Sequence, residues 1–245
     1  EAMYQAATIA LKNSTSKEGV VVLKTVKKTR FKKPVTPGDQ MLINVKISNI
    51  SEDGCDVSGS CKVNGKLSCQ ATFSLAYQNA ADLKPKSLTT EYKTDLFDET
   101  EVVFNSTKIA SYLPHRFPFH YIDKVIYNDD DARIIGQKLF TANEPFAGYS
   151  ASGAFAPNIM LLETVAQLGC VKLLSQEQHK GKLGLFLSIE NAEIKRQAIP
   201  GDMITFDVTF LYFKSVMGKA TGIISCGEEV IATMDIAFAL VPQEA

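Results

Sequence analysis

The stretch PNIMLLETVAQLGCVKLLSQ, residues 157–176, decides the fold of this 245-residue chain. Its opening proline suits the first turn of a helix. Apolar side chains fill nearly every later position, so the pattern predicts a helix that lacks a polar face. Such a helix must be covered on all sides, and long strands are available to cover it. The simplest solution is an α+β fold in which a curved antiparallel sheet wraps one long central helix.

Strand patterns flank this helix on both sides. After the helix, strands are expected at 183–197, 202–213 and 216–240. Before it, a short helix is expected at 105–112, followed by strands at 119–127 and 132–142. Earlier still, the pattern predicts the tail of a helix at 1–13 and strands at 19–33, 39–52 and 54–78, with a break at Asn64-Gly65.

The chain contains an internal repeat. Its matching landmarks, 161 to 163 residues apart, are Glu1 to Gln5 with Glu163 to Gln167, Pro37-Gly38-Asp39 with Pro200-Gly201-Asp202, and Ala71-Thr72 with Ala232-Thr233. Two copies are too few for a solenoid. We therefore expect a partial first domain at 1–80, a linker at 81–104 and a complete second domain at 105–245. The first copy opens at a position that matches mid-helix, so we also expect further sequence upstream of Glu1.

Composition excludes several functional classes. Lys and Arg number 26 against 27 Asp and Glu, and a net charge of −1 argues against a general nucleic-acid binder. No uncharged apolar run reaches the roughly 18 residues of a membrane span. Five cysteines at irregular spacing, without a CxxC pair, predict neither disulfides nor a zinc site. They fit a reducing cytoplasm, and no metal is expected.

Glu163 interrupts the apolar helix. A carboxylate in an apolar wall has a raised pKa, which suits a general acid. Gln167, four residues later, lies on the same helix face. The alternative is a structural glutamate at a domain interface, hydrogen-bonded to backbone.

Four motifs together resemble the bacterial 3-hydroxyacyl-[acyl carrier protein] dehydratases, which have the hot-dog fold. They are Leu113-Pro114-His115-Arg116-Phe117-Pro118-Phe119, Asn143-Glu144-Pro145-Phe146, the helix from Pro157 to Gln167, and Pro200-Gly201-Asp202. The resemblance covers all of the second copy and all that is present of the first, where Arg30 to Gln40 is similar to the same turn. It implies a double hot-dog, a pseudo-dimer within one chain.

The resemblance also implies a reaction, loss of water from a 3-hydroxyacyl thioester to give a trans-2-enoyl thioester, with no cofactor. In the family, a loop histidine removes the proton next to the thioester, and a helix glutamate of the partner hot dog helps the hydroxyl leave. Backbone N–H groups at the start of that helix polarise the carbonyl. Carried over, Glu163 and Glu1 are the catalytic acids, and the implied substrate-binding residues are Gly148, Gly153, Asn158, Ile159 and Gln167.

The catalytic histidine does not carry over. Tyr149 stands in its place, followed by Ser150 and Ala151, and Asn158 replaces a glycine of the family pattern. A phenol with a pKa of about 10 is a poor base at neutral pH, so Tyr149 either donates a hydrogen bond or marks a site that has lost catalysis. We expect Tyr149 to face Glu1 in a degenerate site, while Glu163 faces an upstream loop that carries the working histidine. At most one competent site per chain is expected.

The sequence contains three histidines, and each has a structural interpretation. We expect His115 to anchor its loop, His120 to lie on the following strand and His179 to be solvated in a polar loop.

A basic stretch follows one strand of the first copy. Its cations are Lys28, Arg30, Lys32 and Lys33, with Lys24 and Lys27 beside them. A solvated face is one interpretation. The other is docking of an acidic acyl carrier protein by charge steering.

Two further functions stay open. The chain could be a non-catalytic acyl-thioester binder or scaffold, or a thioesterase, because hot-dog folds host both activities. A homo-oligomer of pseudo-dimers is also compatible with the sequence.

Overall fold

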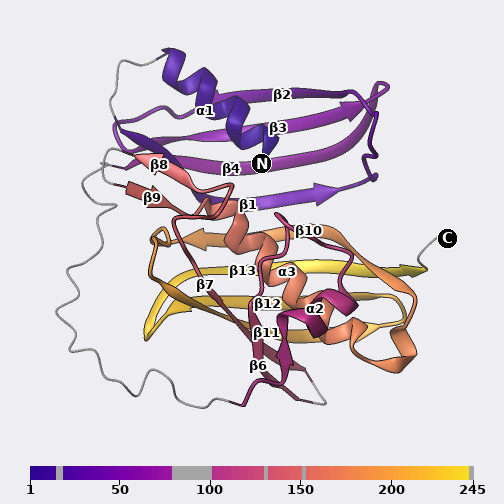
Figure 1. Cartoon of the computed structure of the whole chain (residues 1–245). Coiled ribbons are helices and arrows are strands. Elements are labelled where there is room, and N and C mark those ends of the chain that lie inside the picture. The colour runs from indigo at the N-terminus through magenta and orange to yellow at the C-terminus, as the bar shows by residue number, and fades with distance from the viewer. Residues whose placement is uncertain (15–18, 79–100, 130–131, 151–152, 243–245) are drawn as a thin grey trace, which may run out of the picture.

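A computed structural model describes residues 1–14, 19–78, 101–129, 132–150 and 153–242 (Figure 1). The first half contains α1 (Ala2–Ser14) and strands β1 (Val20–Phe31), β2 (Met41–Ser48), β3 (Gly54–Val63) and β4 (Lys66–Gln78). The second half opens with β5 (Phe104–Asn105), α2 (Ser106–Tyr112), β6 (Lys124–Asn128) and β7 (Arg133–Leu139). It continues with the small strands β8 (Gly148–Ser150) and β9 (Gly153–Phe155), the helix α3 (Asn158–Leu174) and the short 3₁₀ helix η3 (Glu177–His179). It closes with β10 (Lys182–Ile194), β11 (Met203–Lys214), β12 (Met217–Cys226) and β13 (Glu229–Pro242).

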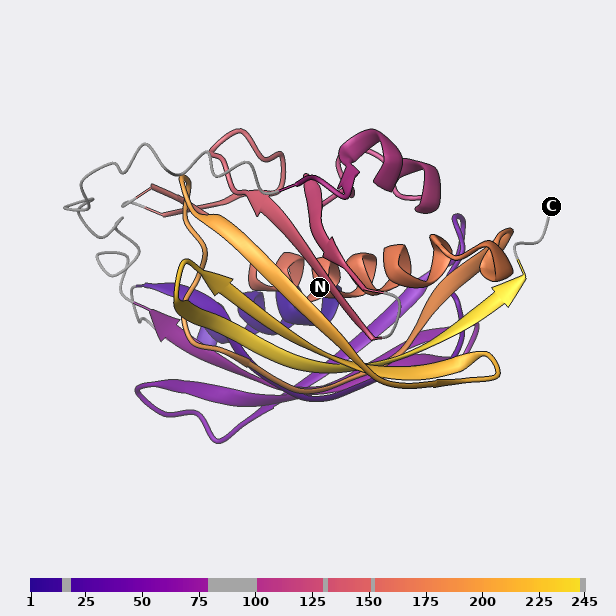
Figure 2. The same cartoon turned by 90° about the horizontal axis from the view of Figure 1, so that it is seen from below.

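One sheet of 11 strands joins the two halves, in the order β2-β3-β4-β1-β10-β13-β12-β11-β7-β6-β5. The junction is the antiparallel pair of β1 and β10, in which Thr25 lies opposite Glu193 and Arg30 opposite Ser188. Each half-sheet curves, and both long helices lie on the same face of the sheet (Figure 2). The predicted strands at 183–197, 202–213 and 216–240 correspond to β10, β11 and the β12–β13 hairpin.

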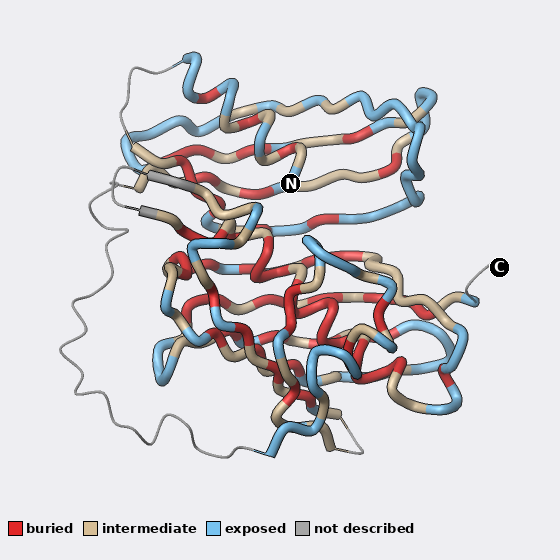
Figure 3. Tube along the Cα trace, viewed as in Figure 1, coloured by how far each residue is buried: buried red, intermediate tan, exposed pale blue. Residues whose placement is uncertain are grey.

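Helix α3 is covered as its sequence predicts. Of its 17 residues 14 are buried, and Leu161, Leu162 and Val165 have no exposed surface. Figure 3 shows this helix as a nearly continuous buried segment inside the second half. No helix in the described part of the chain is long and apolar enough to cross a bilayer.

The repeat is visible in the local geometry of two turns. Gly38 has a φ of 97° and Gly201 a φ of 99°, a region that favours glycine. In each turn the following aspartate accepts a hydrogen bond from the backbone N–H three residues earlier, at 2.9 Å in the first copy and 3.1 Å in the second. The two turns therefore have the same conformation.

Each long helix also approaches its sheet at a glycine. A Cβ built on Gly222 of β12 would lie 2.6 Å from Cγ1 of Val165 in α3, and one built on Gly59 of β3 would lie 2.7 Å from Sδ of Met3 in α1. Contacts this short leave no room for a methyl group unless the helix side chain moves. The same positions of both copies thus set the distance between helix and sheet.

We expect Gly222→Ala to lower the free energy of unfolding by about 1–3 kcal/mol, the usual cost of overpacking. Gly59→Ala should cost less, because the Met3 thioether is flexible whereas the Val165 side chain is branched and stiff. Urea unfolding of the two variants measures the difference. Adding Val165→Ala to Gly222→Ala should recover part of the loss, and equal costs in the two glycine variants would contradict this account.

Two stretches depart from the sequence prediction. The strand expected at 119–127 begins only at Lys124, because the Gln167 side chain takes up backbone groups of the preceding loop: its Nε2 donates to the Phe119 carbonyl at 2.8 Å, and its Oε1 accepts from the Tyr121 N–H at 3.2 Å. Residues 81–100 of the predicted linker at 81–104 lie outside the described residues. At its end, the Val103 N–H donates to the Val125 carbonyl at 2.9 Å.

The expectation for His179 was wrong. The residue is 6% exposed, Nδ1 lies 3.0 Å from the Leu173 carbonyl oxygen, and the ring packs edge-on against Phe213. The histidine closes the end of α3 instead of facing solvent.

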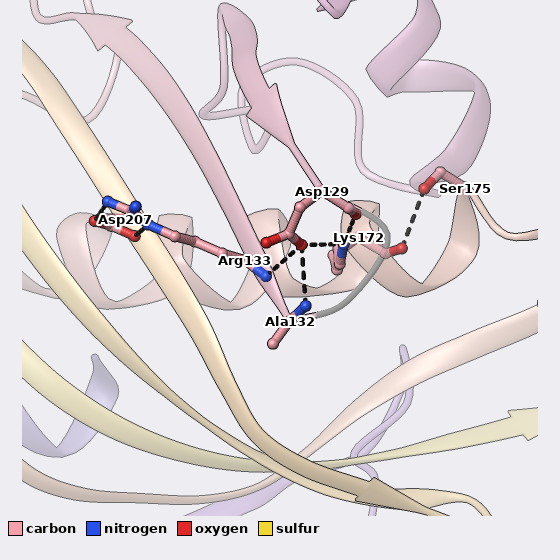
Figure 4. Close-up of polar contacts among 6 residues, drawn as sticks. All are labelled: Asp129, Ala132, Arg133, Lys172, Ser175 and Asp207. Carbon is pink, nitrogen blue, oxygen red and sulfur yellow. Dashed lines mark hydrogen bonds and ion pairs between the residues drawn. The ribbon is translucent and has the colours of Figure 1, made fainter.

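An ion pair between a buried lysine and a partly exposed aspartate fixes the C-terminal part of α3. Lys172 is 3% exposed, and its Nζ donates to the carboxylate of Asp129 at 3.0 Å and to the backbone carbonyl of the same residue (Figure 4). The same carboxylate accepts from the backbone N–H groups of Ala132 and Arg133 at 2.9 and 2.8 Å. Arg133 in turn forms a two-pronged pair with Asp207 on β11, at 2.9 and 2.6 Å. The acidic turn therefore joins α3 to the β6–β7 hairpin.

Candidate active site

Glu163 lies in the second turn of α3, with 29% of its side chain exposed. Burial raises the pKa of its carboxyl above the usual value, while the hydrogen bond from Nε2 of Gln167 to Oε1, at 3.2 Å, acts in the opposite direction. Since Gln167 also bonds the loop that contains Phe119 and Tyr121, it holds the carboxyl and the loop in one arrangement.

The loop that Gln167 holds brings His115 to Glu163. Nε2 of His115 lies 3.6 Å from Oε1 of the glutamate. Burial lowers the pKa of this imidazole, and the neighbouring His120 and Arg116 lower it further. Sequence reasoning gave His115 only an anchoring role, because no periodicity links the loop to the helix. The one available signal was that both residues lie in motifs of the same family resemblance.

A small cavity of about 70 Å³ adjoins the two groups. Its wall consists of His115, Glu163 and apolar residues of α3, β10 and β13, among them Leu185, Phe186 and Phe238. The thiol of Cys170 also lines it, and burial followed by the charge of Glu163 raises the pKa of this thiol to about 12. The site thus combines an acid, an imidazole and the amide of Gln167 with a wall that is otherwise mostly apolar.

A larger cavity of about 510 Å³ lies between the two halves. The first half contributes Glu1, Tyr4, Phe31 and Phe73, and the second contributes Ile159, Leu185 and Phe186. Leu185 and Phe186 line both cavities. Glu1 itself is exposed, and its Oε1 accepts from Nε2 of Gln5 at 2.9 Å, which repeats the Glu163–Gln167 bond in the first copy.

The other residues implied by the resemblance lie around the start of α3. Asn158 is buried, and its Nδ2 donates to the Leu23 carbonyl of β1 at 2.7 Å, so it ties the helix to the first half. Gly148 and Gly153 belong to the β8–β9 pair, and Ile159 lines the larger cavity. Tyr149 is on β8, but its side chain is outside the described part, so its predicted approach to Glu1 stays a prediction.

The basic residues flank the larger cavity on the β1 side. Lys28 pairs with Glu190 across the sheet at 3.1 Å. Arg30 is exposed, and Lys32 and Lys33 line the rim of the cavity. Among the described residues, no group of three or more His, Cys, Asp or Glu side chains is arranged to hold a metal ion.

Solved structures with the hot-dog fold match almost the whole chain. A hot-dog protein from Alicyclobacillus acidocaldarius aligns with 96% of this chain and 84% of its own, at a TM-score of 0.58 and 12% identity. The dehydratase domain of the CurJ module of curacin polyketide synthase aligns with 98% and 83%, at 0.61 and 11%. The tesB protein of Mycobacterium avium subsp. paratuberculosis aligns with 97% and 85%, at 0.58 and 11%. These likenesses confirm the predicted double hot-dog fold.

The relatives found by sequence share a higher identity with this chain than these structures do. The 3-hydroxyacyl-[acyl-carrier-protein] dehydratase FabZ of Acetivibrio thermocellus is 37% identical over 140 residues, which are 57% of this chain and 96% of the relative. The FabZ of Staphylococcus carnosus is 35% identical over 141 residues, 57% of this chain and 97% of the relative. The FabA-like domain model matches residues 1–72 and 113–235, in both halves of the fold. The chain therefore belongs to the FabA-like domain family.

Proposed function

We propose that this chain removes water from 3-hydroxyacyl-[acyl carrier protein] to give trans-2-enoyl-[acyl carrier protein], as in fatty-acid biosynthesis. The observation that carries the proposal is Glu163, a half-buried carboxyl with a raised pKa in a mostly apolar cavity of the central helix. The FabZ names of its relatives support the same reaction.

The chemistry follows from the state of this carboxyl. A hydroxide is a poor leaving group, so the C3 hydroxyl must receive a proton as the C–O bond breaks. A carboxyl with a raised pKa stays protonated to higher pH and can supply that proton. The reaction needs no metal or cofactor, because the acyl group itself carries every bond that changes.

The larger cavity suits the acyl chain. Its wall is mostly apolar and draws on both halves, which suits burial of hydrocarbon, and it shares Leu185 and Phe186 with the smaller cavity that Glu163 lines. We assign the implied substrate-binding residues Gly148, Gly153, Asn158 and Ile159 to the region around the start of α3, and Gln167 to the smaller cavity beside Glu163.

We further propose one competent site per chain, at Glu163. The other site combines Glu1 with Tyr149, whose phenol is a poor base. Residues 1–80 then form a partial first hot-dog domain and residues 105–245 a complete second one. Free thiols at all five cysteines support a reducing cytoplasm as the compartment.

The proposal is tested by mixing the purified chain with 3-hydroxyacyl-[acyl carrier protein]. Dehydration gives a conjugated enoyl thioester that absorbs in the ultraviolet, whereas a thioesterase would release a free carrier thiol. A non-catalytic binder would give neither product but would raise the melting temperature in the presence of acyl thioester. Thiol release or ligand-induced stabilisation without enoyl formation would refute the proposed reaction.

The basic stretch gives a separate prediction about the partner. Changing Lys28, Lys32 and Lys33 together to serine should weaken carrier-protein binding roughly threefold to a hundredfold, at about 0.2–1 kcal/mol per exposed charge. Titration at several salt concentrations should also show a flatter salt dependence. The matched control changes the exposed Lys62, Lys66 and Lys180 to serine, and a similar loss in that variant would exclude a specific docking face.

A further inference from the structure

We propose that Cys61 and Cys69 form a redox-sensitive thiol pair in the wall of the larger cavity, which closes to a disulfide by exchange with a small disulfide such as glutathione disulfide. The two cysteines belong to one hairpin, Cys61 on β3 and Cys69 on β4. The inference does not rest on the proposed dehydration, because no acyl substrate takes part in the exchange.

The register of the hairpin places the two thiols opposite each other. Cys61 is the direct partner of Cys69 in the antiparallel pair of β3 and β4. Side chains of directly opposite residues project from the same face of a sheet, and their Cα atoms lie about 4.5–5.5 Å apart. A disulfide needs Cα atoms about 4.4–6.8 Å apart, so the bridge can form without a change of register.

Two local features hold this register. Asn64 and Gly65 form the two-residue turn of the hairpin, with φ angles of 50° and 75°, and a tight hairpin turn requires this left-handed conformation. Beside Cys69, Ser68 is an extra residue of β4 without a partner on β3, which makes a bulge. The Ser68 carbonyl accepts a hydrogen bond from the Lys32 N–H at 2.8 Å, so the bulge is tied to the chain that follows β1.

The pair faces the larger cavity, and one of its thiols is accessible. Cys61 and Cys69 line this cavity together with Ala71 and Phe73 of β4. Cys61 is 5% exposed, whereas Cys69 is half-buried. Burial, followed by the electrostatic effect of Cys61, raises the pKa of the Cys69 thiol. A small disulfide therefore meets Cys69 first, and the raised pKa keeps the reaction slow at neutral pH.

The exchange balances between the pair and the small disulfide. The Cys69 thiolate attacks one sulfur of glutathione disulfide, so that a new S–S bond forms, the old S–S bond breaks and one glutathione thiolate leaves. Cys61 then loses its proton to solvent, and its sulfur attacks Sγ of Cys69, which releases the second glutathione. The pair gives up two electrons and two protons, and glutathione disulfide is reduced to two glutathione molecules.

The bridge is expected to be reversible. Directly opposite residues have Cβ atoms about 4.5–5.5 Å apart, whereas a disulfide prefers about 3.5–4.5 Å, so closing the bridge costs strain. Strained disulfides are reduced more easily than relaxed ones. In a reducing compartment the pair therefore stays as two thiols, and it closes when oxidised glutathione accumulates.

The second copy of the repeat lacks the pair. Two residues before the repeated Ala-Thr landmark, where the first copy has Cys69, the second copy has Val230. The nearby Cys226 is also half-buried, and burial raises the pKa of its thiol, but it lies opposite Ile204 on β11 and Glu229 on β13. Cys226 is thus an internal control, because any glutathione that attaches there has no opposite cysteine to displace it.

The test incubates the full chain with glutathione disulfide and maps its cysteines by mass spectrometry under non-reducing conditions. In the wild type the β3–β4 hairpin should lose two hydrogen atoms and carry no glutathione, and dithiothreitol should reverse the change. In Cys61→Ala the exchange stops after its first step, so Cys69 should keep one glutathione. The matched control Cys55→Ala changes another buried cysteine of β3 and should form the bridge as the wild type does.

A kinetic measurement on the wild type needs no variant. The rate of bridge formation should rise roughly tenfold per pH unit while the pH is below the pKa of Cys69, because the thiolate is the attacking form. Glutathione that persists at Cys69 of the wild type, absence of any modification at Cys69, or a rate independent of pH would each overturn the pair. None of these outcomes bears on the dehydratase assignment, which is measured separately by enoyl formation.

Discussion

Glu163→Gln is expected to lower kcat for dehydration of 3-hydroxyacyl-[acyl carrier protein] by roughly 10²–10⁴-fold, the usual contribution of a positioned acid. Glutamine keeps the size of the side chain and its bond with Gln167 but has no proton to give to a leaving hydroxyl. The affinity for carrier-bound substrate should therefore change far less than kcat. Steady-state assays that follow enoyl formation measure both quantities.

Two other carboxyls test whether the effect is specific. Glu193→Gln makes the same chemical change on the exposed face of β10 and should leave turnover unchanged. Glu1→Gln changes the corresponding residue of the first copy, and most turnover should survive if that site is degenerate. Equal losses in Glu1→Gln and Glu163→Gln would instead mean that both sites operate, and activity that survives Glu163→Gln would remove the proposed acid.

The Glu163→Gln variant should also change how thermal stability depends on pH. Since burial raises the folded-state pKa of Glu163, ionising it in the folded protein costs free energy once the pH exceeds its unfolded pKa. Glutamine carries no such cost. The melting temperature of Glu163→Gln relative to wild type should therefore rise as pH increases through this range and should show no such gain at low pH.

Sequence patterns predicted those features of the fold that depend on the local composition of the chain. The apolar run that forms α3 requires a cover whatever its partners are, and the repeated Pro-Gly-Asp turns require the same backbone in both copies. The contacts of His115, His179 and Lys172 depend instead on elements distant in the chain. A polar loop gave no sign that His179 would meet the Leu173 carbonyl, and a lysine in a helix gave none that Asp129 would cover it.

The two copies share a helix motif, but the surroundings of its glutamate differ between them. Each keeps a glutamate bonded to a glutamine four residues later, Glu1 with Gln5 and Glu163 with Gln167. Around Glu163 the structure places the imidazole of His115, and burial raises the pKa of that carboxyl, whereas Glu1 is exposed. The surroundings of the carboxyl therefore distinguish the two sites more than the repeated helix motif does.

The largest stability effect is expected at Asp129. Asp129→Ala should lower the free energy of unfolding by about 3–5 kcal/mol, because it leaves the ammonium of Lys172 buried without its counter-charge. The loss of the two turn bonds from Ala132 and Arg133 adds to the cost. Asp129→Asn retains an acceptor for those bonds, so it should cost less, and thermal or urea unfolding measures both variants.

A double variant separates the free-energy cost of the unpaired buried charge from the cost of the lost turn hydrogen bonds. Asp129→Ala combined with Lys172→Met should recover part of the loss, since an apolar side chain of similar size then replaces the buried ammonium and no unpaired charge is left. Asp207→Ala is the control at an exposed pair: Arg133 stays solvated when its partner is removed, so the cost should be about 0–1 kcal/mol. Equal losses in Asp129→Ala and Asp207→Ala would mean that burial of Lys172 does not decide the energetics, and α3 would then depend on apolar packing alone at its C-terminal end.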